Sequence, residues 1–243
     1  MQIIKLDATE STNLYLKKLM LSTALKDCTV VVAKAQLNGR GQRGTKWDSE
    51  TGKNLTFSVL KRFDSLDVGN RFFLNICVSL AIYDSLKQLQ IPDISVKWPN
   101  DILSGHSKIC GILIENILSG KNIQASIIGI GLNVNQLKFT DLPKVSSLKL
   151  LLGRTLNLDE LLLSIIDNLK KYSSTFDQKS RKHLTDSYEK LLFRRDKPST
   201  FKNLKNEMFM GLIRGISADG KLVVSLEDNT RHEFDLKEIK LLY

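Results

Sequence analysis

The sequence predicts an α+β protein that ends in a small antiparallel β-barrel. Two observations lead to this fold class. Up to about residue 192, runs of β-branched and apolar residues alternate with segments of helical periodicity. After that point, short alternating strands are separated by turn signals. The 243 residues allow one large domain with a small appendage. We therefore predict two domains, residues 1–192 and residues 193–243.

The predicted first domain mixes strands and helices. A strand over 3–7 precedes a helix over 11–21, in which Leu14, Leu16 and Leu19 contribute to a loose apolar face. The elements expected next are a buried strand over 28–33, a loop over 38–53, a strand over 55–60, a core helix over 70–89, strands over 94–98, 109–117 and 123–130, and helices over 158–172 and 178–192. The Ser119-Gly120 pair predicts a hairpin turn between the last two strands.

The predicted second domain begins after a charged breaker that ends in Pro198. Strands are expected over 208–216, 221–226 and 231–236, and Asp219-Gly220 is a hairpin signal between the first two. Three or more short antiparallel strands in so short a segment suit a small barrel.

Composition narrows the possible partners. A formal net charge of +10 favours an anionic partner, such as nucleic acid, nucleotide phosphates or an acidic protein. Cys28, Cys77 and Cys110 are unpaired in spacing, and the three histidines are scattered, so neither a disulfide framework nor a metal site is expected. The sequence has no apolar run of membrane-spanning length and no signal-peptide pattern at its start, which predicts a cytoplasmic protein.

The most informative segment is the loop at residues 39–44, which reads Gly-Arg-Gly-Gln-Arg-Gly. Its glycines let backbone N–H groups approach a phosphate, and Arg40 and Arg43 offer fork-shaped donors to phosphate oxygens. Trp47 follows closely and is suited to covering a flat ligand. The spacing fits neither a Walker loop nor a Rossmann fingerprint. Taken alone, the segment is equally compatible with a basic surface loop.

Three further segments carry chemistry. Residues 96–101 supply Lys97 as a positive charge, Asn100 as a donor and acceptor for a base edge, and Asp101 as a carboxylate for Mg²⁺ or for a lysine. Residues 108–115 place Lys108 at the start of an apolar strand. Residues 128–135 alternate glycine within a strand, which indicates that something approaches its backbone closely.

Together these segments resemble the biotin–protein ligases. The order and spacing fit for five segments: residues 10–13 (Glu-Ser-Thr-Asn), the 39–44 loop with Trp47, residues 97–101, residues 108–115 and residues 129–133. The resemblance implies a class II synthetase-like mixed sheet flanked by helices, followed by an SH3-like barrel. It also implies an ATP-dependent ligase that activates biotin to biotinyl-5'-AMP and passes biotin to a lysine of a biotin carboxyl carrier protein.

The resemblance assigns roles to individual residues. The expected biotin-binding residues are Ser11, Thr12, Asn13, Gln36, Gly39, Arg40, Gly41, Gln42, Lys108, Gly111, Gly129 and Gly131. The expected ATP-binding residues are Arg40, Arg43, Trp47, Lys97, Asn100, Asp101, Lys108 and Asn133. The expected catalytic residues are Lys108, Arg40 and Asp101. ATP and Mg²⁺ are the implied cofactors, and no metal site built by the protein alone is expected.

The sequence departs from the family pattern in two respects, which concern retention of the adenylate and binding of DNA. Many members have arginine where this chain has Gln42, and that arginine helps to retain the reactive adenylate. Some relatives carry an N-terminal DNA-binding domain, whereas here the Ser-Thr-Asn segment begins at residue 11. We therefore expect no DNA partner, no membrane partner, and a monomer or homodimer.

Two alternatives stay open at this point. A lipoate–protein ligase or octanoyltransferase shares the catalytic fold, and the octanoyltransferases use a cysteine–lysine pair. Cys110 lies two residues after Lys108, so strand alternation predicts that both side chains point to the same face; the Trp-Pro-Asn-Asp and Gly-Arg-Gly segments nevertheless favour biotin and a core role for Cys110. A nucleic-acid-binding module would suit the charge and the barrel, but the barrel segment has no evident aromatic stacking platform.

Overall fold

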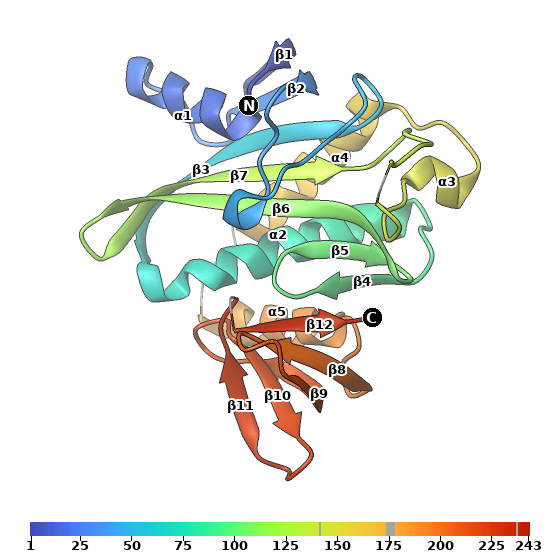
Figure 1. The fold of residues 1–243 in the computed structure, drawn as a ribbon. Helices are drawn as coiled ribbons and strands as arrows, with labels where there is room; N and C mark the ends of the chain where they lie inside the picture. The colour runs from blue at the N-terminus through green and yellow to red at the C-terminus, as the bar shows by residue number, and fades with distance from the viewer. Residues whose placement is uncertain (141, 174–177, 237) are drawn as a thin grey trace.

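Two β-sheets, one above the other in Figure 1, organise the chain. The computed structural model describes residues 1–140, 142–173, 178–236 and 238–243. The first sheet contains β1 (Ile3–Thr9), β2 (Val30–Gln36), β3 (Leu55–Asp67), β4 (Ile94–Lys97), β5 (Asp101–Ser104), β6 (Ser107–Ser119) and β7 (Asn122–Leu132). Its order is β1-β2-β3-β7-β6-β5-β4. Only β1 and β2 pair in parallel, so the sheet is mixed as predicted.

One face of this sheet carries α1 (Thr12–Ser22), which is the crossover between the parallel strands β1 and β2. Leu16 of this helix is fully buried against Val31, Leu60 and Ile127 of the sheet. Leu16 therefore anchors the middle of α1 on this face of the sheet.

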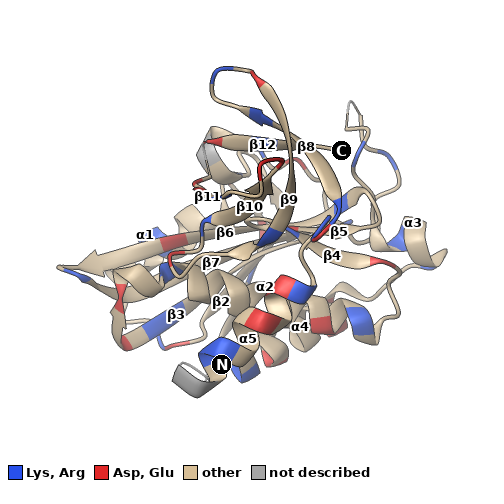
Figure 2. Cartoon of the chain, turned by 90° about the horizontal axis from the view of Figure 1, so that it is seen from below, with Lys and Arg blue, Asp and Glu red and all other residues tan. Residues whose placement is uncertain are grey.

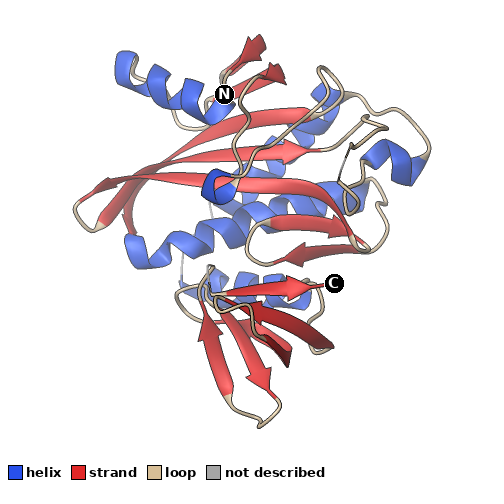
Figure 3. Ribbon diagram, viewed as in Figure 1, coloured by secondary structure: helices blue, strands red, loops and turns tan. Residues whose placement is uncertain are grey.

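The opposite face carries the larger core. It is covered by α2 (Arg71–Gln88) and α4 (Leu158–Ser173), which lie behind the sheet in Figure 3. The helix α5 (Gln178–Lys190) packs against α2 and lies next to the second sheet. Most of α2 is buried, which explains why its sequence is apolar nearly all round. Three short elements complete this part: η1 (Gln42–Gly44), η2 (Val68–Asn70) and α3 (Leu148–Leu152).

The second sheet lies beneath the first in Figure 1. It contains β8 (Pro198–Asn203), β9 (Met208–Ile216), β10 (Leu222–Leu226), β11 (Arg231–Phe234) and β12 (Ile239–Leu242), all antiparallel in the order β11-β10-β9-β8-β12. The Phe209 ring stacks on Phe201, with centroids 5.4 Å apart, and on Phe234, with centroids 5.7 Å apart. Phe201 is part of the core, and the other two rings pack against it. These rings therefore stabilise the sheet instead of forming an exposed stacking platform.

Two side-chain hydrogen bonds link the second sheet to the part of the chain before it. The indole N–H of Trp98, in the turn after β4, donates to the Gly220 carbonyl at 2.9 Å, and the Ile216 N–H donates to Glu189 of α5 at 2.9 Å. The β9–β10 turn approaches closely because Gly220 has no side chain; a Cβ there would lie 2.0 Å from Cγ of Phe72. The second sheet therefore docks directly behind the 97–101 segment.

The predicted fold class is confirmed, with differences in individual elements. The strand expected over 28–33 begins at Val30 because Cys28 has a positive φ of 58°, which a strand does not allow. The structure adds β5, β8, β12 and α3, all of them six residues or shorter. The domain boundary near residue 192 stays a prediction; the second sheet begins at Pro198.

Charge is spread over the whole molecule. Figure 2 shows lysine and arginine on helices and strands alike, interleaved with aspartate and glutamate. The excess of basic residues is thus not confined to one element. Within the described ranges, none of the helices combines the length and apolarity needed to cross a lipid bilayer.

Candidate active site

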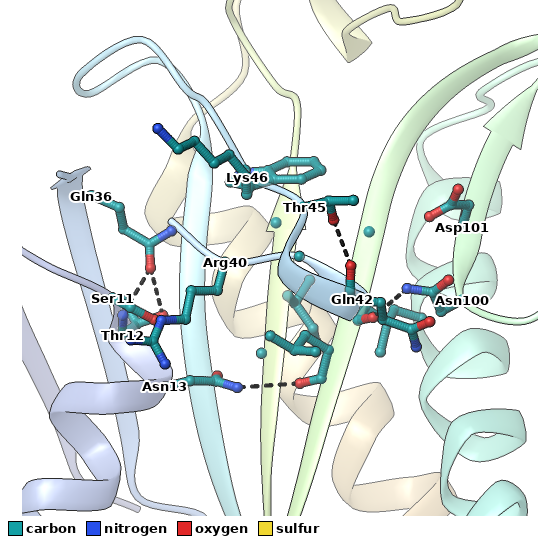
Figure 4. A pocket seen from close by; sticks show the side chains of 18 of the residues that line it. Ser11, Thr12, Asn13, Gln36, Arg40, Gln42, Thr45, Lys46, Asn100 and Asp101 are labelled. Carbon is teal, nitrogen blue, oxygen red and sulfur yellow. Dashed lines mark hydrogen bonds between the residues drawn. The ribbon is translucent and has the colours of Figure 1, made fainter. Parts of the chain in front are cut away.

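A pocket of about 240 Å³ opens between the start of α1, the loop after β2 and the strands β6 and β7 (Figure 4). It brings together segments that are far apart in sequence. Its lining consists of Ser11, Thr12, Asn13, Gln36, Arg40, Gly41, Gln42, Thr45, Lys46, Trp47, Asn100, Asp101, Lys108, Gly111, Ile112, Leu113, Gly129, Ile130 and Gly131. Most of the residues predicted from the sequence therefore lie around one cavity.

Glycines form the floor of this pocket. Gly131 pairs with Gly111 across β7 and β6, and Gly129 pairs with Leu113 in the neighbouring row. An added Cβ at Gly129 would lie 2.4 Å from Oδ1 of Asn13, and one at Gly131 would lie 2.3 Å from Cε2 of Trp47. The glycines are thus required because other side chains lie directly on the strand backbone.

The first end of the pocket is polar. The Gln36 side-chain oxygen accepts from the backbone N–H of Thr12 at 2.8 Å, and the Asn13 side-chain amide donates to Glu115 at 2.7 Å. The hydroxyl of Ser58, on β3, lies 2.7 Å from the Thr12 hydroxyl and 2.6 Å from Oδ1 of Asn13. All of these side chains except Gln36 and Glu115 are buried.

Each hydroxyl in this group has a single proton, which limits the bonds that it can donate. Because the Asn13 nitrogen donates to Glu115, its oxygen must accept the single hydroxyl proton of Ser58. The Thr12 hydroxyl has one proton and lies 2.7 Å from the Ser58 hydroxyl and 3.1 Å from the Gln36 side-chain oxygen, and both oxygens are placed to accept it. Gln36 is oriented by the Thr12 N–H, so its amide nitrogen remains as a donor on the pocket side. Ser11 makes no capping bond to α1, so its hydroxyl is not used by the helix.

The glycine–arginine loop is a small hairpin. Trp47 N–H donates to the Gly39 carbonyl at 2.9 Å, Gly41 N–H donates to Thr45 at 2.7 Å, and Arg40 and Lys46 form an antiparallel bridge. The η1 turn closes it, with the Thr45 hydroxyl bonded to the Gln42 carbonyl at 2.8 Å. In Figure 4 the Arg40 side chain extends from this hairpin toward the start of α1.

The second end of the pocket is charged. Lys108 Nζ lies 2.7 Å from Oδ1 of Asp101, and Lys97 Nζ lies 4.0 Å from Oδ2. Lys108 also lies 5.5 Å from the centre of the Trp47 ring, in cation–π range. Burial lowers the pKa of Lys97; Asp101 opposes that shift and Lys108 adds to it. Asn100 also lines the pocket, and its side-chain amide nitrogen donates to the Ile112 carbonyl at 2.7 Å.

Trp47 joins the floor to the charged end. Its indole lies on Gly131 and within 3.1 Å of a Cβ built at Gly111. The indole N–H is buried and has no hydrogen-bond acceptor among the described residues. Because an unpaired buried donor is costly, the N–H is suited to bond to a ligand.

Cys110 does not share the pocket with Lys108, so the prediction that both point to one face was wrong. The pairing of β5 with β6 shifts between Ile102 and Leu103, which makes Ile109 an extra, unpaired residue in β6. This bulge turns Lys108 into the pocket while Cys110 packs fully buried in the core, where burial raises the pKa of its thiol. The expected core role of Cys110 is confirmed, and a thiol nucleophile is not presented to the pocket.

Four predicted residues are not in the lining. Gly39 lies just behind it, where a Cβ would meet the Trp47 carbonyl at 2.2 Å. Lys97 lies next to the lining, with its Nζ 4.0 Å from Oδ2 of Asp101. Asn133 is buried, and its side chain donates to the Ser146 carbonyl at 3.1 Å, which is a contact with the loop before α3. The side chain of Arg43 lies outside the described residues.

Other residues of the site were missed. Thr45, Lys46, Ile112, Leu113 and Ile130 line the pocket, and Ser58 and Glu115 support it from behind. The sequence offered a signal for only two of them, since Ser58 and Glu115 are polar residues flanked on both sides by apolar residues or, for Glu115, preceded by an apolar run. Searching the described ranges, no group of three or more histidine, cysteine, aspartate or glutamate side chains is placed to hold a metal ion.

Comparison with known proteins agrees with this geometry. A sequence model of the Biotin/lipoate A/B protein ligase family matches residues 6–133. The bifunctional ligase/repressor BirA of Escherichia coli (strain K12) is 30% identical over 223 residues, which are 90% of this chain and 68% of BirA. The biotin–[acetyl-CoA-carboxylase] ligase of Paracoccus denitrificans is 35% identical over 128 residues, 52% of each chain. The biotin protein ligase from Aquifex aeolicus, solved in complex with biotin and ATP, superposes with a TM-score of 0.81 at 26% identity and covers 99% of this chain and 98% of its own.

These matches confirm the predicted resemblance and the expectation of a ligase enzyme. The relatives are named as biotin ligases, which favours the biotin reading over the lipoate alternative. The match to the family model, the similarity to BirA and the shared architecture lead to one conclusion: the chain belongs to the Biotin/lipoate A/B protein ligase family.

Proposed function

We propose that this chain is an ATP-dependent biotin–protein ligase that forms biotinyl-5'-AMP and transfers biotin to a lysine of a biotin carboxyl carrier protein. The observation that carries the proposal is a single pocket with a polar end, a glycine floor and a charged end. Biotin has the same sequence of groups: a ureido ring, an apolar ring and chain, and a carboxylate.

The polar end suits the ureido group. The amide nitrogen of Gln36 is oriented as a donor to the ureido carbonyl, and the Ser11 hydroxyl lies in the same lining. Ile112 and Leu113 supply apolar walls for the ring and chain. A relative in the same family holds biotin and ATP in its solved complex, which supports this assignment.

The charged end suits the first reaction. The biotin carboxylate attacks the α-phosphorus of ATP, the bond from phosphorus to the bridging oxygen breaks, and diphosphate leaves. Two anions must approach each other, so positive charge is needed at that point. Lys108 supplies it at this end, and Arg40 lines the same pocket. Holding the reactants in one orientation contributes the rest of the rate.

The second reaction needs an oriented amine and exclusion of water. Asp101 already holds an ammonium group at 2.7 Å, and we assign it the role of orienting the acceptor lysine. The Trp47 hairpin covers the floor and would shield the mixed anhydride from water. Gln42 lies at the tip of that hairpin without a positive charge, so retention of the adenylate depends on its neighbours.

Mg²⁺ fits this site only as a companion of the nucleotide. Asp101 is the one carboxylate in the pocket lining; Lys108 lies 2.7 Å from its Oδ1, and Lys97 is no nearer than 4.0 Å to its Oδ2. Mg²⁺ in nucleotide enzymes is commonly held by one or two carboxylates together with substrate phosphates. Asp101 and the side-chain oxygen of Asn100 are the protein oxygens that would hold it, and it would neutralise phosphate charge.

The remaining assignments follow from charge and resemblance. Biotin acceptor domains in this family's systems are typically acidic, and a net charge of +10 would speed their encounter with this enzyme. We propose no DNA or membrane partner, a cytoplasmic location, and a monomer or homodimer.

The test is biotin-dependent exchange of labelled diphosphate into ATP, with lipoate and octanoate as competing acids. Biotin should support exchange in the presence of Mg²⁺, and the other two acids should not. Exchange with lipoate in preference to biotin would overturn the proposal. Labelled biotin should then appear on a purified carrier domain, but not on a variant of that domain without its acceptor lysine.

A further inference from the structure

Two lysines flank one carboxylate beside the pocket, and a third lysine shares an aromatic ring with one of them. Asp101 binds Lys108 through one oxygen and lies 4.0 Å from Lys97 through the other. Lys144, from the loop before α3, is connected to this group because its ammonium group and that of Lys97 both contact the ring of Tyr243. The ammonium groups are 4.3 Å (Lys144) and 4.9 Å (Lys97) from the ring centre.

The positive charges exceed the negative ones. Asp101 can neutralise one of the two charges on Lys97 and Lys108, and within the described ranges no carboxylate lies within 4.0 Å of Lys144. Lys97 is about three-quarters buried, with 27% of its side chain exposed, so its charge is poorly solvated. Partly desolvated like charges repel each other, and an entering anion would relieve that cost.

Tyr243 is held rigidly in this position. Its ring packs edge-on against Phe193, with centroids 5.0 Å apart, and stacks on His106 at 6.3 Å. It follows β12, which pairs with β8 in the second sheet. The contact with His106 places this end of β12 beside the turn between β5 and β6, and in Figure 1 the C-terminus lies below that end of the first sheet. Burial, together with the charge of Asp101, raises the pKa of the Tyr243 hydroxyl, which fits a neutral ring at this place.

We propose that Tyr243 is a positioning residue that holds Lys97 and Lys144 as a site for the β- and γ-phosphates of ATP and for the departing diphosphate. This inference rests on the proposed ligase function. In the adenylation step the bridging oxygen leaves with the electron pair, so the diphosphate gains negative charge as the bond breaks. Two lysines fixed on one ring receive that charge without reorganising.

Four variants separate this role from a structural one. Tyr243→Leu removes the ring face, and Lys144→Met removes one charge from an exposed loop. Tyr243→Phe keeps the ring and serves as the conservative rescue. Lys87→Met is the matched control, because Lys87 lies 5.9 Å from the Tyr83 ring at the far end of α2 and removes the same charge and type of contact.

The measurements are the KM values for ATP and biotin in diphosphate exchange and the inhibition constant of free diphosphate. A cation–π contact is worth about 0.5–2 kcal/mol, or roughly 2- to 30-fold. Tyr243→Leu and Lys144→Met should raise the KM for ATP and the inhibition constant for diphosphate by that factor. The KM for biotin should stay within about twofold, and Tyr243→Phe and Lys87→Met should match the unmodified protein in every constant.

Three results would overturn the inference. They are unchanged ATP and diphosphate constants in Lys144→Met, an equal rise in the biotin KM in Tyr243→Leu, and Tyr243→Phe behaving like Tyr243→Leu. Thermal melts establish that each variant is folded, and Lys144→Met carries the test if Tyr243→Leu is not. Absence of biotin-dependent exchange in the unmodified protein is a different failure, because it refutes the proposed function itself.

Discussion

Replacing Gly131 by alanine tests the contact between the pocket floor and Trp47. The new methyl group would lie 2.3 Å from Cε2 of the indole, whereas carbon atoms in contact are separated by about 3.5–4.0 Å. The ring would therefore have to move by more than about 1 Å. Overpacking of this kind costs about 1–3 kcal/mol, which corresponds to roughly a 5- to 150-fold loss in kcat/KM if the ring is needed over the ligand.

A double-mutant cycle isolates that cost. Gly131→Ala should lower kcat/KM for biotin-dependent exchange by the factor above in the unmodified protein, but by little in a Trp47→Ala background, where the methyl has space. Gly129→Ala is the matched control on the same strand. Its methyl would meet Oδ1 of Asn13 at 2.4 Å and not the indole, so its loss should be the same in both backgrounds.

The reasoning fails if Gly131→Ala loses the same factor with and without Trp47. That result would mean that the indole does not rest on β7 in the working enzyme. An equal loss in both backgrounds would indicate instead a direct clash between the new methyl group and the ligand, because that clash does not depend on Trp47.

Four other predictions follow from the site. Lys108→Ala should lower diphosphate exchange roughly 100-fold or more while the thermal melt stays close to that of the unmodified protein, and normal turnover would remove Lys108 from the mechanism. Cys110→Ala should keep exchange within about twofold and cost about 1 kcal/mol in urea unfolding; a loss as large as that of Lys108→Ala would revive a thiol mechanism. Gln42→Arg should slow the release of biotinyl-AMP, measured as adenylate hydrolysed per biotin transferred, and an unchanged ratio would contradict the role given to this position. Because burial lowers the pKa of Lys97, its charge is lost at a lower pH than that of an exposed lysine. Lys97→Arg should therefore shift the rise of the KM for ATP at alkaline pH to a higher pH, since arginine stays charged. Identical pH profiles for the two proteins would refute this.

The sequence predicted the elements whose patterns are local. The helix that became α2 and the hairpin of β6 and β7 were found because apolar periodicity and the Ser119-Gly120 turn are visible in short windows. β12 was missed because a strand of four residues is stabilised by pairing with β8, which lies far away in sequence. α3 was missed for a similar reason, since one turn of helix depends on its Ser147 cap and its contacts.

The site was predicted by resemblance more than by pattern. The resemblance pointed to Lys108 and Gln36, but it could not show that Ser58 and Glu115 fix the direction of the hydrogen bonds around Asn13. Those two residues reach the site only through strand pairing. Asn133 was assigned to the nucleotide, whereas its side chain bonds to Ser146 in this structure.

The bulge at Ile109 decides which chemistry this strand can present. A bulge acts as a one-residue frameshift in the alternation of a strand, so every side chain before it changes face relative to those after it. Here the frameshift falls between Lys108 and Cys110 and leaves the pocket with an amine alone. The same residues with the bulge two positions later would present an amine and a thiol together. In this chain, the position of one unpaired residue therefore decides whether the pocket contains an amine alone or an amine beside a thiol.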